Sequence, residues 1–314
     1  MRRALSLAVQ IVVALAFAVI AVRALAREFG GLSWSEVTAS LGQITIGQGA
    51  AMMLATGIAY CAFATYDRFA LRYFDRALSW RRSALSSTTA YAISNVLGVA
   101  AFTGNVVRYV LFARWGLGGR DVAIAALATM VVVNLALTLV AGFSLLVAPG
   151  LIVEVVGLDA AWAEATGALL LLVAGSLVAI AWFAPQRLPL GEASLGRHGL
   201  TLSLHLLVCV IDYIATAAVL YIILQDSIGV GLLAFVPVFS GAKLLGVMSN
   251  IPGGLGVFEA VMAVFLLDAH SANLAAALIS YRVVFYLLPF AVAVLVLGVR
   301  GLKRDRRSLL PQGR

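Results

Sequence analysis

Long apolar runs separated by short polar segments dominate the chain. Six of the runs are long enough to cross a bilayer as a helix, at about 20 residues per crossing. They cover residues 4–22, 44–66, 122–148, 162–184, 200–224 and 274–298. The pattern therefore predicts an all-α polytopic membrane protein with about six full transmembrane helices.

The first run follows Arg2 and Arg3, an arrangement that is also typical of a signal peptide. It lacks a cleavage site of small residues and is long enough to span, so we interpret it as the first membrane helix. Composition agrees with a membrane protein, because only 11% of the 314 residues are charged and the mean hydropathy is +1.04. A soluble domain carries about 25% charged residues. These figures exclude a soluble enzyme and a nucleic-acid-binding domain of ordinary construction.

Two further apolar regions, residues 85–115 and 228–267, are interrupted by Gly, Asn, Ser and one Pro-Gly-Gly. Short cytoplasmic loops hold most of the Lys and Arg of a membrane protein. If each region enters and leaves on one side, 18 of the 22 basic residues fall inside and 2 outside; a single crossing at 85–107 gives 13 and 7. The count favours two hairpins and places both termini in the cytoplasm.

The first hairpin has about 30 residues, too few for two full crossings, so we expect two half-helices that enter the membrane part-way. The second is longer, and the sequence leaves open one full span with a short helix or two half-helices. Ser94-Asn95-Val-Leu-Gly98 in the first hairpin is echoed by Ser249-Asn250-Ile-Pro252-Gly253 in the second. This echo indicates either an inverted repeat, as in many transporters, or chance similarity. We expect one domain, residues 1–314, with a basic cytoplasmic tail at 301–314.

Five ionisable residues lie in the apolar regions, where each is costly and therefore a functional candidate. They are Arg108, Asp212, Lys243, Glu259 and Arg282. One interpretation pairs them as structural ion pairs, with Asp212 bonded to Lys243 or Arg282. Arg108 has a further alternative, in which its side chain reaches the lipid headgroups. With three cations and two anions, we expect one positive charge to remain for an anionic ligand.

The segment from Asn250 to Glu259 carries the most information. Pro252 ends a preceding helix, whereas Gly253, Gly254 and Gly256 permit backbone angles that other residues avoid. A new helix is expected to begin near Val257, with Glu259 in its first turn. Its free amides could bind a phosphate, or the segment could be a tight turn capped by Glu259. Irregular backbone in a membrane is buried by protein or lines a watery cavity, and we favour a polar cavity near the midplane.

Three segments of the sequence resemble the lysylphosphatidylglycerol synthase transmembrane-domain family. They are Ser249-Asn250-Ile-Pro-Gly-Gly-Leu-Gly-Val-Phe-Glu259, Tyr281-Arg282 and Leu288-Pro289. Its members include the flippase-like domain of MprF-type proteins and the stand-alone UPF0104/YbhN group. Ser94-Asn95 and the Gly104-x3-Arg108 spacing resemble the family's other shared stretch, although Asn105 stands where an acidic residue is common. The resemblance covers residues 40 to 300, and it implies the translocating half of MprF-type proteins without their soluble aminoacyl-transfer domain.

The resemblance and the broken hairpins together predict a lipid flippase of the bacterial inner membrane rather than an enzyme. The substrate would be a phospholipid or related amphiphile, with aminoacylated phosphatidylglycerol as one candidate. We expect headgroup contacts from Asn95, Gly98, Gly104, Arg108, Asp212, Lys243, Asn250, Pro252, Gly253, Gly254, Gly256, Glu259 and Arg282. Asp212, His205 or Glu259 could couple transport to protons, because no ATP-binding Gly-x4-Gly-Lys-[Ser/Thr] motif occurs.

Two other functions stay open at this stage. The chain could be an accessory subunit that presents lipid intermediates to a separate synthase or glycosyltransferase. It could also be a phosphatidylglycerol lysyltransferase, although common hydrolase and metalloprotease motifs are missing from the sequence. We expect no cofactor, no metal and no nucleic-acid partner, and a homo-oligomer is compatible with the sequence.

Overall fold

The computed structural model describes residues 34–74, 76, 78–97, 100–150, 153, 157, 159–183, 199–249, 251–266 and 271–308. Within these ranges five segments are long and apolar enough to cross a membrane. They are α3 (Ile46–Arg72), α6 (Gly119–Val147), α8 (Ala160–Phe183), α9 (Gly199–Ile228) and the joined α12 and α13 (Ser271–Tyr281 and Leu288–Ser308). Five of the six expected spans are thus confirmed, and the sixth, 4–22, lies outside the described residues.

The two broken regions form two helical hairpins. The first consists of α4 (Trp80–Leu97) and α5 (Ala100–Ala113), which pack against each other. Helices of 18 and 14 residues are about 27 and 21 Å long, and neither is among the five candidate spans. Gly104 faces α4 at this contact, where an added Cβ would lie 3.4 Å from the carbonyl oxygen of Ala90. Two short helices are thus confirmed here, whereas their part-way entry into the membrane stays a prediction.

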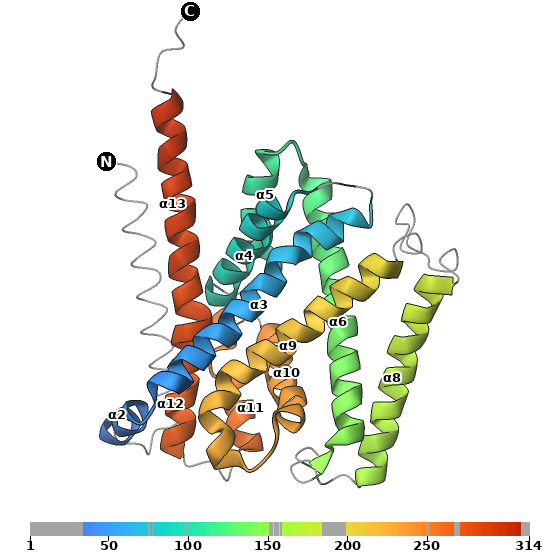
Figure 1. Ribbon diagram of the computed structural model, residues 1–314, viewed down its shortest axis with the longest axis vertical. Coiled ribbons are helices and arrows are strands. Elements are labelled where there is room, and N and C mark those ends of the chain that lie inside the picture. Colours follow the sequence, from blue (N-terminus) through green and yellow to red (C-terminus); the bar gives the residue numbers. More distant parts are fainter. Residues whose placement is uncertain are drawn as a thin grey trace, which may run out of the picture.

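The second hairpin resolves the alternative that the sequence left open. It consists of α10 (Leu232–Met248), a short 3-10 turn (η3, Pro252–Gly254) and α11 (Val257–Phe265). With 17 and 9 residues these are two short helices rather than one full span and a short helix. In Figure 1 the first hairpin occupies the upper part of the molecule and the second the lower part.

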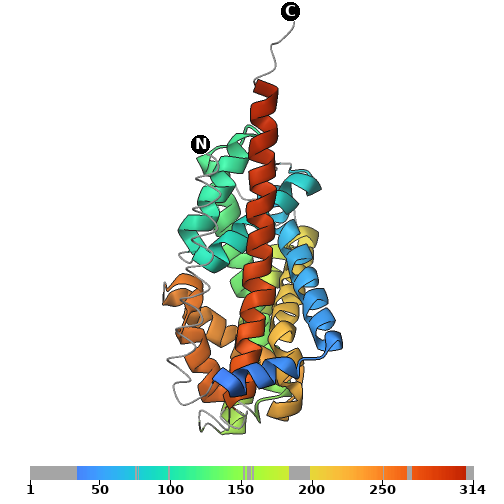
Figure 2. The same cartoon turned by 90° about the vertical axis from the view of Figure 1, so that its left-hand side faces the viewer.

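The two hairpins touch where α4 contacts η3, the turn of the second hairpin. Seen along the other direction, the first hairpin again lies above the second, beside α13 (Figure 2). Opposed hairpins are what an inverted repeat requires, although these two differ in helix length. The long helices α3 and α9 pack along each other and carry much of the buried core. A short helix, α2 (Trp34–Gly42), packs against α12 and was not expected.

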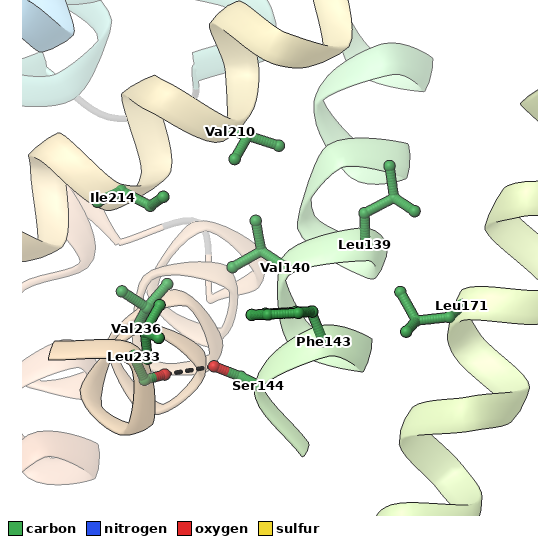
Figure 3. Close-up of a pocket in the computed structure, with 9 residues that line it drawn as sticks. All are labelled: Leu139, Val140, Phe143, Ser144, Leu171, Val210, Ile214, Leu233 and Val236. Carbon is green, nitrogen blue, oxygen red and sulfur yellow. Dashed lines mark hydrogen bonds between the residues drawn. The ribbon is translucent and has the colours of Figure 1, made fainter. Parts of the chain in front are cut away.

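Two proline residues interrupt helical hydrogen bonding, and a hydroxyl from a neighbouring helix compensates for each. Proline has no N–H to donate to the carbonyl four residues earlier. In α10, Pro237 leaves the carbonyl of Leu233 free, and Ser144 of α6 donates its hydroxyl to it (Figure 3). This pairing matters because a bare carbonyl is costly in a membrane.

The second proline lies at the start of α13. Pro289 cannot donate to the carbonyl of Phe285, which instead accepts the hydroxyl of Tyr60 at 3.4 Å. Just before this proline the helix widens into a π-helix, Arg282–Leu287, in which Leu288 N–H bonds to the carbonyl of Val283. Single π turns are frequent at functional sites, and this one begins with Arg282.

Candidate functional site

The second hairpin holds a buried ion pair between Glu259 of α11 and Arg282 of the π-helix. Arg282 donates to Glu259 Oε1 through Nη2 at 2.5 Å and through Nε at 2.9 Å. Its Nη1 bonds to the carbonyl oxygen of Gly253 at 2.5 Å. Both side chains are at most 3% exposed. The arginine therefore ties the Pro-Gly-Gly turn, the start of α11 and the last membrane segment to one point.

The backbone of this turn follows the sequence expectation. Gly253, Gly254 and Gly256 all have positive φ, at 62°, 64° and 84°. Glu259 is the third residue of α11, and its Oε2 accepts the N–H of Gly256 at 2.8 Å. The expected helix start at Val257 is confirmed, and so is the capping by Glu259. Asn250 and Gly98 lie outside the described residues, and only the backbone of Pro252 is described.

The first hairpin contains a second buried ion pair, which joins Arg108 of α5 to Asp67 of α3. Arg108 Nε lies 2.8 Å from Asp67 Oδ1, and the two residues are 7% and 0% exposed. Arg108 Nη1 donates to Asn105 Oδ1 at 3.2 Å. Among the described residues, Arg108 Nη2 is buried without a hydrogen-bond partner. Arg108 therefore lies in the protein interior, and the alternative in which it reaches the headgroups is wrong.

Serine side chains of α4 hold Asp67 in place. Ser86 donates its hydroxyl to Asp67 Oδ2 at 2.6 Å, and the N–H of Asp67 donates to Ser87 Oγ at 3.0 Å. Ser83 accepts the N–H of Arg68 and donates to the carbonyl of Ala64, so its side chain enters the helical ladder of α3. The carboxylate that meets Arg108 is therefore fixed by three elements.

Sequence reasoning missed Asp67. This residue follows the apolar run 44–66 and precedes Arg68, so it resembles the first residue of a polar loop. The structure continues α3 to Arg72 and buries Asp67 completely. The signal that could have found it is the run of small hydroxyl residues at the start of the first hairpin, which implies polar groups opposite them. Asp67 adds a third anion to the three cations, and Lys243 remains the cation that makes no ion pair within the described chain.

The ion-pair interpretation of Asp212 is also corrected. Arg282 bonds to Glu259 rather than to Asp212, because Glu259 lies at the turn directly beside the π-helix. Asp212 instead accepts hydrogen bonds from Tyr66, at 3.0 Å, and from Thr216, at 2.9 Å. Lys243 lies within electrostatic reach of Asp212 but makes no ion pair with it.

A row of aromatic rings begins at the arginine of the first hairpin. Arg108 lies over the ring of Tyr91, with its Cζ 5.5 Å from the ring centroid. Tyr91 is stacked on Phe63 at 4.3 Å, and Phe63 contacts Phe285 edge-on at 6.5 Å. The row therefore leads from α5 through α4 and α3 to the π-helix.

The other two cations contact the far end of this row. Lys243 Nζ lies 5.5 Å from the centroid of Phe285. Phe285 contacts Tyr286 at 5.6 Å, and Arg282 lies over Tyr286 at 4.7 Å. Cations are attracted to the faces of such rings. All three predicted cations are thus linked through aromatic rings, and a polar cavity shared by them stays a prediction.

Two hollows in the described part of the chain are apolar. One, of about 360 Å³, lies between α6, α8, α9 and α10 (Figure 3). It is lined by Leu139, Val140, Phe143, Ser144, Leu171, Val210, Ile214, Leu233 and Val236. The other, of about 540 Å³, lies between α3 and α9. Neither of these two hollows is lined by Arg108, Glu259 or Arg282.

Replacing Asp67 by Asn is expected to lower the stability by about 1–3 kcal/mol, the cost of a buried polar group that loses its partner. The loss stays moderate because Asn105 and the ring of Tyr91 still face the arginine. Thermal unfolding in detergent measures it. The exposed Asp226, changed to Asn, serves as the control; an equal melting temperature for both variants would contradict a role for Asp67 in holding Arg108.

Comparison with known proteins gives relatives at low identity. The chain is 28% identical over 301 residues to an uncharacterized protein of Synechocystis, covering 92% of this chain and 91% of that protein. It is 26% identical over 249 residues to the inner membrane protein YbhN of Escherichia coli, covering 76% and 75%. No protein-family model matches the chain.

A shorter match involves a phosphatidylglycerol lysyltransferase of Staphylococcus epidermidis, 34% identical over 89 residues. It covers 27% of this chain and only 11% of the enzyme. The relatives agree with the five apolar helices in describing a multi-pass membrane protein. They thus include both YbhN and phosphatidylglycerol lysyltransferases, so the family resemblance expected from the sequence is confirmed.

Proposed function

We propose that the protein moves a phospholipid or a related amphiphile across the bacterial inner membrane. One observation carries the proposal: two opposed hairpins contact each other, and each contributes one residue to a buried arginine–carboxylate pair. Buried charges in membrane segments mark pathways for polar or charged substrates. Transporters commonly build their sites where broken helices of two halves meet.

The charged groups suit a zwitterionic or anionic headgroup. Arg108 Nη2 is a buried donor without a partner among the described residues, and guanidinium groups bind phosphate well. Lys243 is half-buried and makes no ion pair within the described chain, so it offers a second cation. Asp212 and Glu259 are the anions to which an aminoacyl ammonium group would bind. The row of rings between Arg108 and Arg282 gives an ammonium group further contacts along the path.

The apolar hollow between α6, α8, α9 and α10 suits the acyl chain of such a lipid (Figure 3). Its side chains are aliphatic or aromatic apart from Ser144, whose hydroxyl already donates to Leu233. Because α10 also carries Lys243, a chain in this hollow and a headgroup near the rings would contact the same hairpin. Rocking of that hairpin would move both ends of the lipid together.

Reconstitution in liposomes tests the proposal. We expect the purified protein to accelerate the transbilayer movement of fluorescent phosphatidylglycerol or its lysyl ester at least 10-fold over protein-free liposomes. An Arg108→Gln variant is expected to lose most of this acceleration, whereas Asp226→Asn keeps it. Equal rates with and without protein for anionic, zwitterionic and aminoacylated lipids would overturn the proposal.

A further inference from the structure

Asp212 differs from the other buried carboxylates that the structure describes. The other three each lie within 3.6 Å of an arginine nitrogen; they are Asp67, Asp121 and Glu259. Asp212 is 4% exposed, and within the described chain its oxygens accept hydrogen bonds only from the hydroxyls of Tyr66 and Thr216. An arginine favours the ionised carboxylate, whereas a hydroxyl can donate to either form and can also accept from the protonated one. Asp212 can therefore keep its hydrogen bonds to Tyr66 and Thr216 both when it is ionised and when it is protonated.

The groups that face Asp212 come from four neighbouring helices and from α9 itself. They are Tyr60 and Tyr66 of α3, Tyr91 of α4, Lys243 of α10, Tyr281 of α12, and Cys209 and Tyr213 of α9. The single cation among them is Lys243, which belongs to the second hairpin. A proton on Asp212 removes the charge that attracts Lys243. Protonation would therefore change the attraction between α9 and the hairpin that we expect to move.

Three titratable side chains, Tyr66, His205 and Tyr73, lie between Asp212 and the end of α3. His205 lies two turns before Asp212 on the same face of α9, fully buried, and its Nε2 has no hydrogen-bond partner among the described residues. Its Nδ1 lies 3.2 Å from the hydroxyl of Tyr73, the residue that ends α3. The ring of Tyr66 lies 5.3 Å from the ring of His205, and its hydroxyl bonds to Asp212.

We propose that Asp212 is a proton-binding site that couples lipid movement to proton movement, with His205 and Tyr66 as the relay. In this relay a proton passes from the hydroxyl of Tyr73 to His205 Nδ1 and is replaced on Tyr73 from the end of α3, while the opposite nitrogen, Nε2, releases a proton toward Tyr66. Tyr66 then passes its hydroxyl proton to Asp212 Oδ2 and receives one from the histidine side, so the phenol is unchanged afterwards. The inference rests on the proposed lipid transport. Asp212 would take up a proton from one side of the membrane when the second hairpin lies away from it. It would release the proton to the other side when the hairpin approaches.

Liposomes with an imposed pH gradient and an internal pH dye test the coupling. For the wild type we expect the gradient to change the rate of lipid movement about 5-fold or more, a common size for coupled binding, together with proton flux. Asp212→Asn keeps both hydroxyl neighbours but cannot titrate, so its lipid movement should ignore the gradient. The matched control Asp226→Asn lies on the same helix and should respond as the wild type does. A gradient response that persists in Asp212→Asn would overturn the inference.

A second measurement separates this inference from the proposed function. Infrared difference spectra recorded between acidic and alkaline buffer should show a protonated-carboxyl band in the wild type and in Asp226→Asn. The band should vanish in Asp212→Asn and return in Asp212→Glu, which also checks that the site still folds. If no lipid moves but the band behaves in this way, the transport proposal fails while the proton site stands. If lipid moves and Asp212→Asn keeps the band, the proton site is wrong.

Discussion

Replacing Glu259 by Gln is expected to destabilise the protein by about 3–5 kcal/mol, the cost of leaving one member of a buried ion pair without its partner. The variant leaves the Arg282 guanidinium, which is 3% exposed, without a counter-charge. The amide also binds the N–H of Gly256 less strongly, so the first turn of α11 loses part of its cap. Thermal or denaturant unfolding in detergent measures the loss, and lipid movement should fall to the protein-free rate.

A double-mutant cycle shows whether the effect belongs to the pair. Arg282→Met removes the other charge and keeps much of the side-chain volume. The double variant, Glu259→Gln with Arg282→Met, has no unpaired charge and is expected to be more stable than Glu259→Gln alone. If the losses from the two single variants simply add, the two residues do not act as a pair.

Replacing Gly254 by Ala is expected to produce the second large effect, at the tip of the second hairpin. An added Cβ would lie 2.9 Å from Cα of Gly246, a backbone atom of α10 that cannot rotate away. The residue also has a φ of 64°, which costs an alanine about 1–2 kcal/mol. Forcing an atom into this contact adds about 1–3 kcal/mol. We expect a lower melting temperature and loss of lipid movement, since the tip meets α4.

Gly256 provides the matched control for this variant. It also has a positive φ, 84°, but an added Cβ would find no atom within 4 Å. With a ψ of −47°, Gly256→Ala carries a backbone cost of about 1–3 kcal/mol without the contact. The difference in melting temperature between the two variants measures the close approach of η3 to α10. Equal melting temperatures would show that this approach contributes nothing.

The central turn shows how far local sequence reasoning reaches. Pro252 and the glycines predict a break and a helix start from their backbone chemistry alone, and the structure confirms both at Val257. The same reasoning finds Arg108, Glu259 and Arg282, because charges in apolar runs stand out. It does not find their partners. Arg282 is separated from Glu259 by 23 residues and Arg108 from Asp67 by 41, and no local pattern encodes such distances.

The burial of Asp67 illustrates the remaining limit. Its neighbours along the chain make it look like a loop residue, and only the approach of α4 and α5 to α3 encloses it. The row of rings from Arg108 to Arg282 is equally invisible in the sequence, since its aromatic residues belong to α3, α4 and the π-helix. Aromatic residues in membrane helices are too common to indicate which of them touch.

The sequence by itself determined the fold class, the five spans that the structure describes and the two broken hairpins. It could do so because length, hydropathy and backbone chemistry are local properties. It also determined which membrane charges deserve study. Only the tertiary structure decided that the charges form two separate arginine pairs and that Asp212 has no arginine. The physical reason is that a charge in a low-dielectric interior binds the nearest partner in space, and distance in space is set by helix packing.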